Sequence, residues 1–288
     1  MKTTLDHLPL QKQQDITAAM ETIVNMVAPE MVILFGSFSR GDWVEDVYVE
    51  NGTTYEYKSD YDILVVTKKE EHEPPGLHKK IRRKIQRGLR METPLTIIFH
   101  DIKYLNEELE QGHYFFSDIV KEGTMLYNTG KFELATPKEL SSAARADKAR
   151  DYFDKWFKNA NDFFEYYRFG VERNSLNTAI FQLHQAAERY LLTIALVFTD
   201  YKPKTHDLVD LNKQAGIADP RFKTVFPNKT EEEKRLLILL NKAYIDSRYK
   251  LNYTVDPADL QWLSERVQKL QELTEVVCKE KIEGYGNG

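Results

Sequence analysis

The sequence is short of several features that would place it in a particular class of protein. Its 288 residues include one cysteine, Cys278, so an intrachain disulfide is excluded. The longest clean apolar run, 191–198, is far shorter than the roughly 20 residues of a membrane helix. The N-terminus lacks a charged-then-apolar signal pattern, and a net charge of −5 gives no general basic character. We therefore expect a cytoplasmic protein that does not enter a membrane.

The chain is long enough for two domains, and its two halves differ in pattern. Short apolar runs typical of strands occur in the first half and largely vanish after Asp147. We predict an α+β protein with a mixed sheet and flanking helices over residues 1–130. A linker over 131–146 and an all-α up-and-down bundle over 147–288 follow.

The stretch Met31–Val66 carries the first candidate site. An apolar strand, Met31–Phe35, is stopped by Gly36-Ser37, and Asp60-Tyr61-Asp62 leads into a second apolar run. Side chains two apart in a strand lie on one face, so Asp60 and Asp62 are expected side by side. Such a carboxylate pair favours a hard cation, Mg²⁺ or Mn²⁺, bound together with phosphate. The glycine lets the backbone turn sharply, and its N–H groups with the Ser37 hydroxyl suit phosphate oxygens.

These residues resemble a known signature. Gly36-Ser37-Phe38-Ser39-Arg40-Gly41, followed by Ser59-Asp60-Tyr61-Asp62, resembles the motif of the minimal nucleotidyltransferases of the polymerase-β superfamily. The resemblance implies that Asp60 and Asp62 bind the catalytic metal. It also implies that Gly36 and Ser37 hold the triphosphate of an NTP and that Arg40 is the motif arginine.

The expected third carboxylate of this family is not evident. On the next strand, 95–99, its position falls near Thr96, which carries no charge. Glu92 or Asp101 would have to substitute, and His100 is a candidate proton acceptor. With two carboxylates, one metal ion should bind with an NTP and a second more weakly. This departure leaves nucleotide binding without transfer as an alternative.

Two segments around this motif each have a structural and a functional interpretation. Residues 42–58 predict a β-hairpin insert that turns at Asn51-Gly52. The hairpin is either an extended arm on the sheet or an element that recognises a substrate or partner. Residues 77–89 predict a basic helix. It carries Lys79, Lys80, Arg82, Arg83, Lys84 and Arg87. These cations form a solvated face or lie over a polyphosphate or RNA backbone.

The second half predicts four long helices with one short insertion. Thr136, Pro137 and Glu139 have the spacing of a capping box, and so do Thr230 and Glu233. Asp207 is predicted to cap a short helix. His184 and Glu188, one turn apart, favour helix packing over ligand binding.

This half also resembles a family, the HEPN domain. The resemblance is carried by the segments 181–189, 204–208 and Ser247-Arg248-Tyr249. Many HEPN domains are ribonucleases that use an arginine followed some five residues later by a histidine, where this chain has Arg248 and Tyr253. A tyrosine is a poor proton acceptor near neutral pH, so RNA cleavage is not expected. Arg248 is instead expected to bind a nucleotide phosphate or to form an ion pair within the bundle.

Together these patterns predict a metal-dependent nucleotidyltransferase fused to a HEPN bundle. Its cofactor would be Mg²⁺ or Mn²⁺, and ATP is the leading candidate among the NTPs. RNA, a protein or a small molecule would supply the acceptor hydroxyl, and a homodimer would form through the bundle. A regulatory nucleotide-binding module and a HEPN ribonuclease fused to its transferase are the alternatives. Adenylylation of Tyr249 or Tyr253 is a further hypothesis.

Overall fold

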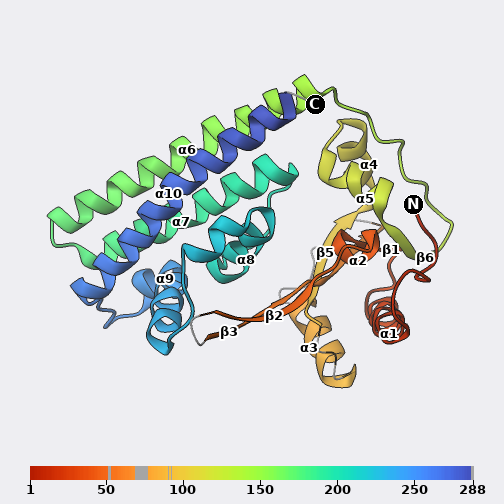
Figure 1. Ribbon diagram of the computed structural model, residues 1–288, viewed down its shortest axis with the longest axis horizontal. Coiled ribbons are helices and arrows are strands. Elements are labelled where there is room, and N and C mark those ends of the chain that lie inside the picture. The colour runs from red at the N-terminus through yellow and green to blue at the C-terminus, as the bar shows by residue number, and fades with distance from the viewer. Residues whose placement is uncertain (51–52, 69–76, 90, 92, 287–288) are drawn as a thin grey trace. The chain divides into compact units, whose positions relative to one another are not determined.

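The computed structural model describes residues 1–50, 53–68, 77–89, 91 and 93–286. The chain forms two compact units, Met1–Glu139 and Leu140–Gly288. Figure 1 shows a small sheet with helices in the first unit and helices alone in the second. The predicted α+β fold class is confirmed. Among the described residues, no helix has both the length and the apolar character needed to span a membrane.

A mixed four-stranded sheet forms the centre of the N-terminal unit. Its strands lie in the order β5 (Leu95–Asp101), β4 (Tyr61–Thr67), β1 (Met31–Phe35) and β6 (Thr124–Asn128). β1 pairs antiparallel with both of its neighbours, whereas β4 and β5 are parallel. Strand β1 is buried over Met31–Leu34, as expected for the apolar centre of a sheet covered on both faces.

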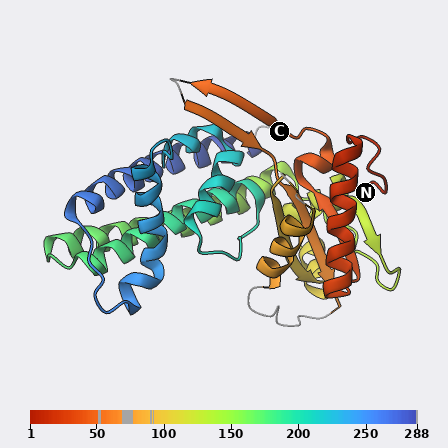
Figure 2. The same ribbon diagram turned by 90° about the horizontal axis from the view of Figure 1, so that it is seen from below.

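Helices cover the sheet because their apolar stripes need a partner surface. α1 (Leu10–Val27) and α3 (Leu77–Leu89) lie on the near side of the sheet in Figure 2. They share a core with every second residue of β4, namely Tyr61, Ile63 and Val65. α4 (Ile102–Glu110) packs against β4 and β5, and α5 (Tyr114–Glu122) packs against β1.

The insert forms a sheet of its own. β2 (Glu45–Glu50) and β3 (Thr53–Lys58) pair antiparallel, as predicted, and the proposed Asn51-Gly52 turn lies outside the described residues. At its base the Ser59 N–H donates to the Val44 carbonyl at 2.9 Å. The Val44 N–H donates in turn to the Ser59 hydroxyl oxygen at 3.0 Å. These two bonds close the insert where it leaves the main sheet.

The C-terminal unit is a helical bundle. Its long helices are α6 (Ser142–Glu172), α7 (Leu176–Thr199), α9 (Glu231–Tyr249) and α10 (Pro257–Gly286). The shorter α8 (Leu208–Ala218) and a 3₁₀ turn, η1 (Pro220–Thr224), lie between α7 and α9 in the chain. α7 packs against α6, α9 and α10, and it is the most buried of these helices.

Two of the predicted helix starts are confirmed and one is wrong. Thr230 and Glu233 form both bonds of a capping box at α9, and Asp207 caps α8. The capping box predicted at Thr136 does not form, because the chain there bonds to the end of α4 instead. The Ala135 N–H donates to the Asn106 side chain at 2.8 Å, and the Lys138 N–H donates to the Leu109 carbonyl at 2.9 Å. α6 starts later, after the N-cap Ser141.

Candidate functional site

The Gly36-Ser37 turn lies directly beside one of the two aspartates. β1 ends at Phe35, whose Cα is in register with that of Asp62. The chain then enters the five-residue helix α2 (Gly36–Arg40), and Gly36 has a φ of +72°, a conformation that favours glycine. A Cβ at Gly36 would lie 2.5 Å from Asp62 Oδ2. Only glycine therefore brings this turn so close to the carboxylate.

Asp60 and Asp62 lie at the start of β4, with Thr96 on the neighbouring strand. Tyr61, between them, is buried in the core shared with α1 and α3, so the two carboxylates project from the opposite face. The Cα of Asp62 is in register with that of Thr96 in β5. The Thr96 hydroxyl donates to Asp60 Oδ2 at 3.1 Å. Both aspartates are half-buried, so a ligand can reach them.

Asp101 and His100 do not complete this group. They occupy the far end of β5, in register with Thr67 and Val66. Asp101 caps α4 by accepting from the Tyr104 N–H at 2.8 Å. His100 is buried and stacks on Tyr104 with ring centroids 4.8 Å apart. The structure therefore places neither residue beside the two aspartates. Glu92, the other suggested substitute, lies outside the described residues.

The remaining residues of the first motif are held by other groups. The buried Ser39 hydroxyl donates to the Glu122 carbonyl at 2.9 Å and contacts the Thr124 hydroxyl at 2.9 Å. Arg40 pairs with Asp42 at 3.0 Å and with Glu122 at 3.8 Å. In the described part of the chain, no group of three or more histidine, cysteine or acidic residues has a metal-binding arrangement. A metal ion at this edge would therefore depend on Asp60, Asp62 and the ligand's own oxygens.

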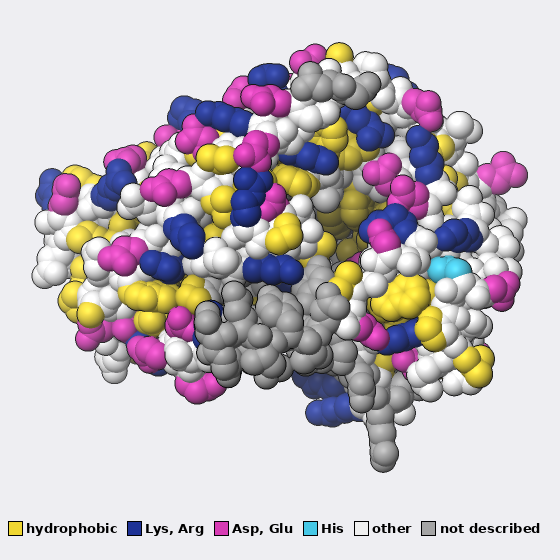
Figure 3. Space-filling view, in the orientation of Figure 1, with side chains coloured by type: hydrophobic (Ala, Val, Ile, Leu, Met, Phe, Trp, Pro, Cys, Tyr) yellow, Lys and Arg dark blue, Asp and Glu magenta, His cyan; other side chains and the backbone are white. Residues whose placement is uncertain are grey.

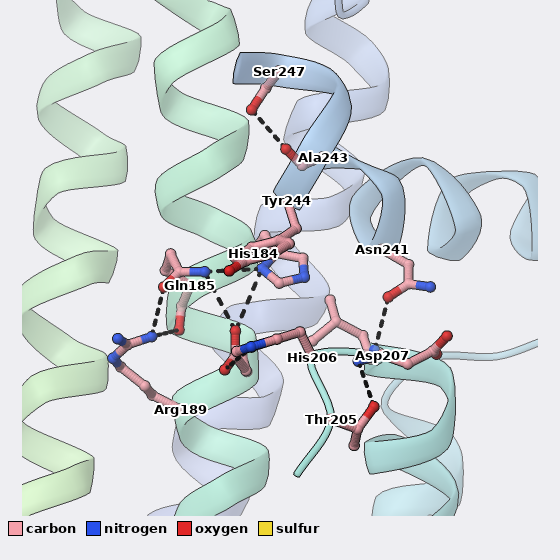
Figure 4. A network of polar contacts seen from close by, with 12 residues as sticks. His184, Gln185, Arg189, Thr205, His206, Asp207, Asn241, Ala243, Tyr244 and Ser247 are labelled. Carbon is pink, nitrogen blue, oxygen red and sulfur yellow. Dashed lines mark hydrogen bonds and ion pairs between the residues drawn. The ribbon is translucent and has the colours of Figure 1, made fainter. Parts of the chain in front are cut away.

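A second polar cluster lies in the helical bundle, with His184, Gln185 and Glu188 buried and His206 exposed, and Figure 4 shows it from close by. Glu188, on α7, accepts from His206 Nδ1 at 3.0 Å and from the Gln185 side chain at 3.3 Å. His184 Nδ1 lies 3.9 Å from the second Glu188 oxygen. Burial is the main reason that the pKa of His184 falls to about 4, so this ring is neutral at pH 7. The sequence assigned helix packing to His184 and Glu188 but did not reveal the contact with His206.

Arg248 lies at the end of α9 among aromatic rings. Its guanidinium carbon is 4.4 Å from the ring centroid of Tyr244 and 5.0 Å from those of Phe181 and Tyr249. Its Nε donates to the Tyr244 carbonyl at 2.6 Å. None of the described acidic residues lies within ion-pairing distance of Arg248. The expected ion pair therefore does not form, and the guanidinium makes cation–π contacts instead.

Tyr253 occupies the position of the histidine in the ribonuclease motif. Its side chain is buried, and burial together with the nearby Asp246 raises its pKa to about 12. Its hydroxyl has no hydrogen-bond partner among the described residues. A neutral, enclosed phenol does not accept a proton near pH 7, as general-base catalysis would require.

The comparisons with known proteins agree with the second half of this description. The family model of the HEPN domain matches residues 153–282, which covers the bundle from α6 to α10. The C-terminal unit is thus a HEPN domain. A search of curated proteins finds no match to the chain.

Proposed function

We propose that the N-terminal unit binds a magnesium–nucleoside triphosphate and transfers the nucleoside monophosphate to an acceptor hydroxyl. The observation that supports the proposal is the placement of Gly36 against Asp62, which brings the Gly36-Ser37 turn beside one of the two aspartates although the whole insert separates them in the chain. ATP is the nucleotide that we would test first.

The residues present fit a single magnesium ion. Mg²⁺ in nucleotide sites is commonly held by one or two carboxylates, with phosphate oxygens and water in the remaining positions. Asp60 and Asp62 supply two carboxylates, and the Thr96 hydroxyl fixes one oxygen of Asp60. A bound magnesium ion would neutralise charge on the phosphate oxygens.

The chain's own groups have distinct roles in this proposal. The Gly36 and Ser37 backbone N–H groups and the Ser37 hydroxyl bind the β- and γ-phosphates. The acceptor oxygen forms a bond to the α-phosphorus as the bond to the pyrophosphate oxygen breaks, and the acceptor proton passes to solvent. Arg40, held by Asp42 and Glu122 at the end of α2, adds positive charge beside the turn.

The test follows label from α-labelled NTPs with Mg²⁺ or Mn²⁺ in wild type and in a double variant, Asp60→Asn with Asp62→Asn. We expect binding and transfer to fall at least 100-fold in this variant, because the cation loses both charged ligands. A matched control replaces two exposed carboxylates of α6, Asp151→Asn with Asp154→Asn, and should behave as wild type. Label transfer that survives the loss of Asp60 and Asp62 would refute the proposal.

Thr96 favours a second candidate, a module that binds the nucleotide without transferring it. A neutral side chain in register with Asp62 leaves the group one carboxylate short of the resembled family's site. Thr96→Asp would add that charge, whereas Thr96→Val removes only the hydroxyl. If wild type binds NTP without transfer and Thr96→Asp alone gains transfer, the binding module is the correct description. Equal transfer in wild type and Thr96→Asp would exclude it.

The HEPN match also keeps ribonuclease activity as a hypothesis, but the buried Tyr253 speaks against it. Cleavage of RNA by wild type that disappears in Arg248→Ala would support a ribonuclease despite this tyrosine. We expect no cleavage by either protein.

A further inference from the structure

Helix α3 has one buried side and one strongly basic side. Ile81 and Ile85, one turn apart, are almost fully buried in the core shared with α1 and the sheet. The other described side chains of its middle turns are mainly cationic, and the helix contains no acidic residue. Since the apolar side is already covered, the basic side is the surface that α3 presents to solvent.

Four of these cations form a single stripe. Lys80, Arg83, Lys84 and Arg87 are exposed and follow each other at intervals of three, one and three residues, so they share one face over two turns. Dark blue side chains project at the lower edge of Figure 3, where Figure 1 has α3. None of the four forms an ion pair or hydrogen bond with another residue that the structure describes.

Several exposed cations of the bundle helices, in contrast, form ion pairs within their own helix. Lys158, Arg168, Lys234 and Lys279 each pair with an acidic residue three or four positions away on the same helix. Such pairing is common on solvated helices of a protein with a net charge of −5. The concentration of positive charge on α3, with no neutralising partner among the residues that the structure describes, therefore indicates an anionic partner.

The connectivity of the sheet brings this stripe toward the candidate active site. β4 and β5 are parallel, so α3 must carry the chain back from the end of β4 to the start of β5. The C-terminal end of α3, with Arg87, thus returns to the sheet edge at which Asp60, Asp62 and Thr96 lie. The stripe and the carboxylates lie on opposite faces of the sheet but approach the same edge.

We propose that α3 binds the sugar–phosphate backbone of a polynucleotide and guides one end of the strand to the edge carrying Asp60 and Asp62. The acceptor hydroxyl would then belong to a nucleic acid, which makes this second part dependent on the proposed function. Lys80 to Arg87 spans about 10 Å along the helix, enough for several regularly spaced phosphates of one strand. A single small anion would not use the whole stripe.

A membrane surface fits α3 less well. Basic amphipathic helices bind anionic lipids by inserting their apolar side into the interface. In α3 that side consists of Ile81 and Ile85, both in the core of the unit. Only electrostatic attraction would remain, so a polynucleotide is the better match.

The test measures the fluorescence anisotropy of labelled single-stranded RNA and DNA 20-mers with the full-length chain between 50 and 200 mM salt. Four phosphate contacts predict that wild-type affinity falls about 50-fold over this range, from a slope of about −0.7 per contact. The variant Lys80→Gln, Arg83→Gln, Lys84→Gln, Arg87→Gln should bind at least 10-fold more weakly at 50 mM and lose most of the salt dependence. Binding of RNA, DNA or both through α3 supports the proposal and identifies the strand.

The matched control removes the same charge from paired cations by Lys158→Gln, Arg168→Gln, Lys234→Gln and Lys279→Gln, and should bind as wild type. Equal losses in both variants, or tight binding only to anionic vesicles, would overturn the proposal. Circular dichroism establishes that both variants fold. The Asp60→Asn, Asp62→Asn variant should keep polynucleotide binding while losing NTP. NTP binding without polynucleotide binding would thus refute this inference alone. Polynucleotide binding through α3 without NTP binding would refute the proposed function and the guidance of the strand, but not the binding surface on α3.

Discussion

In the N-terminal unit the backbone positions the polar groups, whereas in the helical unit the polar side chains position one another. Strand register alone sets Asp62 beside Gly36 and Thr96, and the carboxylates remain half-exposed. In the bundle, Glu188 is buried and already accepts from His206 and Gln185. Partly exposed carboxylates remain accessible from solvent, whereas a buried network satisfies its polar groups internally.

The largest effect expected from this comparison is that of Gly36→Ala. The new methyl group would combine a strained φ with a 2.5 Å contact to Asp62. We expect a loss of about 3 kcal/mol in unfolding free energy, measured in urea, and loss of NTP binding. Gly130→Ala is the control, because Gly130 has a φ of +71° with nothing within 4 Å of an added Cβ. Its cost should be about 1 kcal/mol, and equal costs would show that the contact with Asp62 is unimportant.

A smaller effect should come from acid titration of the buried network. His184 has a pKa of about 4 in the folded bundle and a normal value of about 6.5 when unfolded. The unfolded chain therefore binds more protons between these values, and stability falls as pH drops from about 6.5 to about 4, by up to about 3 kcal/mol. Other titratable or charged groups also face His184, and they determine the remaining pH dependence of stability. They are His206, Glu188, Arg189 and Arg248.

The measurement compares unfolding free energies at pH 7, 5.5 and 4 in wild type and in His184→Asn, which cannot titrate there. The variant should start lower at pH 7, because it loses packing, and then decline less steeply. Parallel pH profiles for the two proteins would mean that His184 is not the group responsible.

The smallest effect on stability is expected from a change at Tyr253, which occupies the position of the histidine in the ribonuclease motif. Tyr253→Phe removes a hydroxyl that has no hydrogen-bond partner among the described residues, so stability should change by less than about 0.5 kcal/mol or rise. Tyr190→Phe is the matched control, since that hydroxyl donates to Asn161 at 2.6 Å and its loss should cost about 1–3 kcal/mol. Thermal or urea unfolding measures both. A large cost at Tyr253 would indicate that its hydroxyl has a polar partner. The contrast between Tyr253 and the hydrogen-bonded Tyr190 would then be weaker.

Local pattern was sufficient for most of the fold. The basic segment 77–89 was predicted as the helix that became α3, and the apolar runs predicted β1 and β4. Local pattern failed at Thr136, where a good capping sequence lost to hydrogen bonds with α4, because long-range contacts override local preference. A single sequence contains no direct signal for such contacts.

The sequence likewise predicted part of the candidate sites and missed another part. Thr96 was placed near the aspartates by the resemblance to the transferase motif, and the structure has Asp62 in register with it. The Glu188–His206 contact joins residues 18 positions apart across a loop, and no spacing rule connects them. One sign was available, since a glutamate on the apolar face of α7 requires a partner when buried.

The closed base of the insert has a consequence for how the N-terminal unit can be altered. Because Val44 and Ser59 meet through two hydrogen bonds, the chain enters and leaves β2–β3 at almost one point. Replacement of the hairpin by another segment, or by a short bridge, would leave the pairing of β1 with β4 in place. The insert is thus a part of the unit that could be exchanged without altering the sheet that holds the aspartates.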